Sequence, residues 1–217
     1  MGFYISEQTL KEIYEALNDP HEICGILEMY DLDVERTKQM ITQKNVFIGT
    51  SNSCEVPKDR GRDSPLFFSE DELKYHTHPM TSYSYPSFED LFSVMKKRSD
   101  NRNLHSFIFT KWGVWILFPK EEKFESRDYD KEYNKYKNDQ TIKNFRRNTE
   151  IFKRSHLSKS HQEVRQDISK YIETVNELFK KYITIHLYPW DDIERDYGSL
   201  NGTELEGLVY FEGQGSE

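Results

Sequence analysis

Two histidines and an aspartate in the middle of the chain have the types and spacing of metal ligands. His76 and His78 stand two residues apart in Tyr75-His76-Thr77-His78-Pro79. On an extended segment, side chains two residues apart point to the same side, so both imidazoles can reach one ion. Asp90 lies one turn inside a predicted helix and can supply a third ligand. Two histidines and one aspartate with one open coordination position are typical of catalytic zinc, and not of closed structural sites.

Zinc-dependent hydrolysis also needs a group that takes a proton from water and passes it to the leaving amine. Zinc hydrolases usually employ a carboxylate for this task. Glu22 stands at the start of the first predicted buried strand. It is therefore our candidate for the general base.

The same residues resemble the motif of the JAMM, or MPN-plus, metalloprotease family. In that family a glutamate on an early strand precedes His-x-His-Pro, seven residues, Ser, two residues and Asp. These positions are occupied here by Glu22, His76, His78, Pro79, Ser87 and Asp90. The stretch His21-Glu22-Ile23-Cys24-Gly25 also looks like the Glu-x-Cys-Gly often found around that glutamate. The resemblance covers about residues 7 to 118.

The resemblance implies an α/β fold of the α+β type, a JAB/MPN-like mixed, curved β-sheet flanked by helices. It also implies one zinc ion on His76, His78 and Asp90, with Glu22 as general base and then proton donor. Ser87 would donate a hydrogen bond to the oxyanion, although a capping box with Asp90 would also explain this serine. Members of the family usually cut the isopeptide bond that links ubiquitin, or a ubiquitin-like protein, to lysine. Such conjugates are the expected substrates, as for a deubiquitinase.

Two other functions stay open at this point. A small-substrate amidase, or a peptidase that trims carrier-protein tails, would use the same chemistry. A non-catalytic MPN-type scaffold would only bind partners, but inactive members typically lose a ligand or the glutamate. The family commonly has a helix and another strand where residues 58–69 stand here, so this part looks abbreviated. The insertions by which deubiquitinases of the family bind ubiquitin are not recognisable either. The sequence therefore does not specify the substrate.

Hydrophobic spacing predicts the elements that position these residues. Apolar residues at helical spacing predict a helix over 6–18, capped by Ser6, and another from Ser87 to residue 97. Alternating or continuous apolar runs predict a sheet of about five or six strands, with two antiparallel hairpins: 22–29 with 38–48, short pieces at 66–68 and 73–76, and 104–110 with 114–118. Together with the family resemblance, these elements imply a JAB/MPN-like metalloprotease domain over residues 1–125.

The rest of the chain has a different character. Residues 126–185 are highly charged, and their apolar residues repeat three or four positions apart, which predicts a helical extension. Residues 186–217 are acidic and rich in glycine, which predicts an irregular tail. The extension is a candidate surface for a protein partner or for self-association.

Composition limits the remaining possibilities. The formal net charge of -8 argues against general nucleic-acid binding. No apolar run approaches the length of a membrane span, and the N-terminus lacks a secretory pattern. Cys24 and Cys54 are too few for a disulfide framework, so reduced thiols are expected. These features together predict a cytoplasmic protein.

Overall fold

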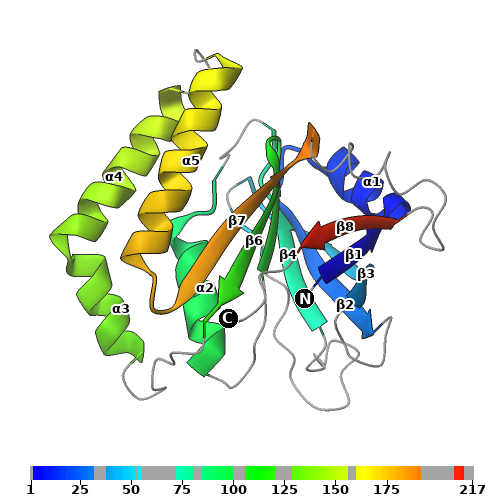
Figure 1. Ribbon diagram of the computed structural model, residues 1–217, viewed down its shortest axis with the longest axis horizontal. Coiled ribbons are helices and arrows are strands. Elements are labelled where there is room, and N and C mark those ends of the chain that lie inside the picture. The colour runs from blue at the N-terminus through cyan, green and yellow to red at the C-terminus, as the bar shows by residue number, and fades with distance from the viewer. Residues whose placement is uncertain are drawn as a thin grey trace. The chain divides into compact units, whose positions relative to one another are not determined.

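The computed structural model in Figure 1 describes residues 2–31, 38–51, 53–54, 72–80, 85–99, 106–120, 129–155, 160–191 and 208–212. The chain divides into two compact units. The first comprises residues 1–82, 106–115 and 187–217, and the second comprises residues 83–105 and 116–186.

The first unit is built on a mixed sheet in which six strands have the order β5-β4-β2-β3-β1-β8. These are β1 (Gly2–Ser6), β2 (Ile23–Asp31), β3 (Lys38–Ile48), β4 (Glu72–Thr77), β5 (Ser106–Thr110) and β8 (Leu208–Glu212). The pairs β1/β3 and β4/β5 are parallel, and the other pairs are antiparallel. Beyond β5 the strand order continues with β6 (Gly113–Pro119) and β7 (Ile183–Pro189).

Helix α1 (Glu7–Ala16) connects β1 to β2 in the first unit. Ser6 caps it, because its side-chain oxygen accepts a hydrogen bond from the Thr9 N–H at 3.1 Å. Leu10, Ile13 and Leu17 repeat at helical spacing and are buried. Asn18 and Asp19 then form the turn that leads into β2.

The second unit is helical and has an aromatic core. It contains α2 (Phe88–Ser99), α3 (Tyr129–Asn138), α4 (Gln140–Ser155) and α5 (His161–Leu178). Helices α4 and α5 run side by side (Figure 1), and the rings of Phe145 and Tyr171 lie 5.6 Å apart between them. Phe179, just after α5, is fully buried and contacts the rings of Phe88 and Phe92 on α2. Aromatic side chains thus fill this core with few residues.

The mixed α+β architecture was predicted correctly, and so were α1, α2, both hairpins and the helices after residue 128. Three strands were missed: β1 at the N-terminus, and β7 and β8, which lie wholly or partly in the region expected to be an irregular tail. The sheet is consequently larger than predicted, with eight strands in the described part of the chain. The predicted strand piece at 66–68 lies outside the described residues.

Among the described helices, none has the length and apolar character needed to cross a bilayer.

Candidate metal centre

His76 and His78 converge at the end of β4. His76 is the penultimate residue of the strand, and His78 follows it directly, with its N–H donating to the carbonyl oxygen of Phe109 on β5 at 2.8 Å. The two Nε2 atoms lie 3.1 Å apart. Two nitrogens bound to one tetrahedral zinc at about 2.0–2.1 Å would lie about 3.3–3.4 Å apart. The two imidazoles therefore have nearly the separation that a shared zinc requires.

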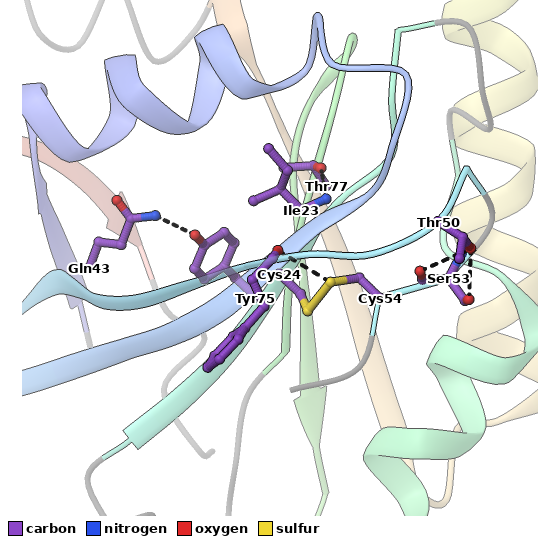
Figure 2. Close-up of a disulfide and its surroundings, with 9 residues drawn as sticks. Ile23, Cys24, Gln43, Thr50, Ser53, Cys54, Tyr75 and Thr77 are labelled. Carbon is purple, nitrogen blue, oxygen red and sulfur yellow. Dashed lines mark hydrogen bonds between the residues drawn. A yellow bond between two sulfur atoms is a disulfide. The ribbon is translucent and has the colours of Figure 1, made fainter. Parts of the chain in front are cut away.

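Thr77, between the two histidines, points to the other face and joins β4 to β2. It is fully buried, and its Oγ1 accepts a hydrogen bond from the Ile23 N–H at 2.9 Å (Figure 2). Sequence reasoning gave this threonine no role. In the sequence, it was marked only as a polar, β-branched residue between two candidate ligands. The hydrogen bond fixes the register of the two strands beside the histidines.

That register brings Glu22 to the same place. Cys24 on β2 lies opposite His76 on β4 in the antiparallel ladder. Continuing the ladder by two residues on each strand puts Glu22 across from His78. Directly opposite residues project to the same face of an antiparallel pair. Glu22 and the two histidines are therefore expected on one face, as the proposed proton transfer requires.

The backbone of Glu22 is hydrogen-bonded to the two residues that follow β3. Its N–H donates to the Thr50 carbonyl oxygen at 2.7 Å, and its own carbonyl oxygen accepts from the Gly49 N–H at 2.8 Å. The residue is 6% exposed. A carboxylate in so buried a position is unusual without a specific partner or task.

Ser87 and Asp90 form a reciprocal capping box at the start of α2. The Asp90 N–H donates to Ser87 Oγ at 3.1 Å, and the Ser87 N–H donates to Asp90 Oδ2 at 2.5 Å. This is the geometry that the sequence predicted for the helix start. The cap orients the Asp90 carboxylate, whose second oxygen, Oδ1, can serve as a metal ligand.

The three predicted ligands form a group with metal-binding geometry. One ligand atom from each of His76, His78 and Asp90 lies within 4.8 Å of the others. Nitrogen and carboxylate donors of this kind suit zinc, and three protein donors leave a fourth position for a reactant. The side chains of all three are buried or half-buried. The donor set can therefore hold a metal ion, and its chemistry suits zinc.

No protein-family model and no curated protein matches this chain. The interpretation of the site consequently depends on the residues themselves.

A disulfide lies directly beside the centre and corrects one prediction. Cys24 and Cys54 are bonded to each other, with their Cα atoms 5.7 Å apart, so the expectation of reduced thiols was wrong. Figure 2 shows the bond joining β2 to the segment that follows β3. The two cysteines are separated by 30 residues in the sequence, and spacing alone does not predict their approach. The correction removes one ground for the predicted cytoplasmic location.

Gly25, next to Cys24, is explained by close packing. A Cβ atom there would collide with the Asn45 carbonyl oxygen on β3 and would lie 2.6 Å from a ring carbon of Tyr75 on β4. Only glycine lets the three strands approach in this way. The Cys-Gly pair after Glu22 thus has a structural cause in this fold.

Reduction of the disulfide is expected to lower the free energy of unfolding by about 3–4 kcal/mol, because the bond closes a loop of 30 residues in the unfolded chain. Urea unfolding of the oxidised protein, and of the same protein with a dithiol reductant, would measure the difference. The Cys24→Ser/Cys54→Ser double variant is the matched control, because its midpoint should not respond to reductant. Two free thiols per chain in denatured, unreduced protein would contradict the assignment of the bond.

Proposed function

We propose that the protein is a zinc-dependent hydrolase of amide bonds, with a JAB/MPN-type fold, in which His76, His78 and Asp90 hold the metal. The observation that carries this proposal is the mutual approach of their ligand atoms within 4.8 Å. It is supported by the 3.1 Å separation of the two Nε2 atoms and by the buried carboxylate of Glu22, directly before the neighbouring strand β2. A structural role would need a fourth protein donor.

Glu22 is assigned the proton transfers of the reaction. When bound, zinc lowers the pKa of a water molecule to about 7 and polarises a carbonyl oxygen. The Glu22 carboxylate accepts the proton of the attacking water and then donates it to the nitrogen of the leaving amine. The two hydrogen bonds on its backbone keep the residue in place during both transfers.

Ser87 is assigned the stabilisation of the oxyanion. Because its Oγ accepts the Asp90 N–H, the hydroxyl proton is directed away from that bond and can be donated to the substrate. A single donor of this kind contributes about 3 kcal/mol to the transition state. The capping and catalytic interpretations of Ser87 are therefore compatible, since the cap employs the acceptor and the reaction employs the donor.

The proposed substrate is the isopeptide or peptide bond between ubiquitin, or a ubiquitin-like protein, and its conjugate. This part of the proposal rests on the resemblance of the six motif residues to the JAMM family. The motif is complete from Glu22 to Asp90, which favours an enzyme over a scaffold that has lost activity.

The proposal is tested with ubiquitin dimers of defined lysine linkage and with short peptides that contain the same isopeptide bond. We expect zinc-loaded protein to cleave the dimers, to stop when a chelator is added and to resume when zinc is restored. Cleavage of the short peptides alone would favour an amidase or a carrier-protein peptidase. Stoichiometric zinc with no hydrolysis of either substrate would favour the scaffold and contradict the proposal.

A further inference from the structure

The peptide group that precedes Ser87 is held at both ends by side chains. Its carbonyl, from Pro86, accepts a hydrogen bond from the Tyr171 hydroxyl at 2.6 Å. Its N–H, from Ser87, donates to Asp90 Oδ2 at 2.5 Å. A peptide group is planar, so the orientation of its carbonyl also fixes the direction of its N–H. Tyr171 therefore acts on the same rigid group that orients the Asp90 carboxylate.

Tyr171 is itself immobilised in the helical core of the second unit. It is 4% exposed on α5, and its ring packs against Tyr85 at 4.8 Å and Phe145 of α4 at 5.6 Å. Burial, with a smaller contribution from the nearby Asp90 charge, raises the pKa of Tyr171 well above its usual value. The hydroxyl thus remains a donor throughout the ordinary pH range.

The hydroxyl is not needed for packing alone. The neighbouring buried positions on this face of α5 are the aliphatic Val164, Ile168 and Val175. A buried hydroxyl costs free energy unless it finds a partner, and this one finds its partner 85 residues away in the chain. The first turn of α2 is also held to α4, because Arg146 of α4 pairs with Glu89 at 2.9 Å.

We propose that Tyr171 is a positioning residue for the metal ligand Asp90, acting through the Pro86–Ser87 peptide group. The inference rests on the proposed function, and it gives the helical extension a role in building the centre. Groups that orient metal ligands from outside the coordination sphere typically change metal affinity by 10–100-fold when removed. Loss of the Tyr171 hydroxyl is expected to act in the same way.

The test compares Tyr171→Phe with Tyr136→Phe, in which a ring that packs on Phe179 in the same core loses its hydroxyl. Zinc affinity is measured by competition with a chromophoric chelator. We expect zinc to bind 10–100-fold more weakly to Tyr171→Phe and unchanged to Tyr136→Phe. In metal-free protein, the Ser87 and Asp90 amides should exchange with deuterium faster only in Tyr171→Phe, because both amides donate within the cap.

Unchanged zinc affinity and unchanged exchange in a folded Tyr171→Phe variant would overturn the inference. Equal losses in both variants would also overturn it, since they would indicate a general loosening of the core. If wild-type protein binds no zinc, the proposed function fails. The exchange measurement then still decides separately whether Tyr171 holds the Ser87–Asp90 turn.

Discussion

Glu22→Gln is expected to lower kcat for isopeptide hydrolysis by about 10³-fold while the zinc content stays at its wild-type level. Glutamine keeps the shape of the buried side chain but cannot take a proton from water. Because Glu22 is not among the three ligands, the metal should remain in place. The measurement is steady-state kinetics on a cleavable ubiquitin dimer, combined with metal analysis of the same samples.

Glu28→Gln provides the matched control for this prediction. Glu28 lies on β2, six residues and therefore about 20 Å farther along the extended chain than Glu22. The identical chemical change there should leave kcat within about twofold. Retained activity in Glu22→Gln, or an equal loss in Glu28→Gln, would refute the role of Glu22 as the general base.

Zinc is expected to raise the melting temperature of the wild-type protein and to leave that of His78→Ala unchanged. A ligand at 100 times its Kd stabilises a folded protein by about 2.7 kcal/mol. For a chain of this size that corresponds to about 5–10 °C. Alanine at position 78 removes one of three protein donors, so zinc at the same concentration should no longer bind.

His21→Ala is the control for the thermal shift. His21 is exposed and contacts Asp19 at 3.0 Å, in the turn just before β2. Its removal should preserve the full response to zinc. A zinc-dependent shift of normal size in His78→Ala would argue that the metal binds elsewhere on the protein.

The candidate ligands could be predicted because their chemistry is local in the sequence. His76 and His78 are two residues apart on a strand, and Asp90 is tied to Ser87 by a capping box within one turn. Each relation depends on backbone periodicity and not on long-range folding. Glu22 was predicted from its place at the start of the first predicted buried strand and from its resemblance to a family motif. Its place across from His78 depends on the strand register.

The missed features depend on distant parts of the chain. Strand β8 is a five-residue segment whose place is set by pairing with β1, more than 200 residues earlier in the sequence. Strand β7 did carry an alternating apolar pattern at Ile183 and Ile185, but it followed the periodic helical stretch without a break. The disulfide and the Tyr171 hydrogen bond likewise join residues whose approach only the fold determines.

Zinc content per chain is the most direct measurement of whether these residues form a metal centre. Protein purified without chelator and dialysed against trace zinc should contain one zinc ion per chain. The His76→Ala/His78→Ala double variant, prepared in the same way, should contain none while the His21→Ala control keeps its full content. Wild-type protein without bound zinc, or a double variant that retains one ion per chain, would contradict a zinc centre built from His76, His78 and Asp90.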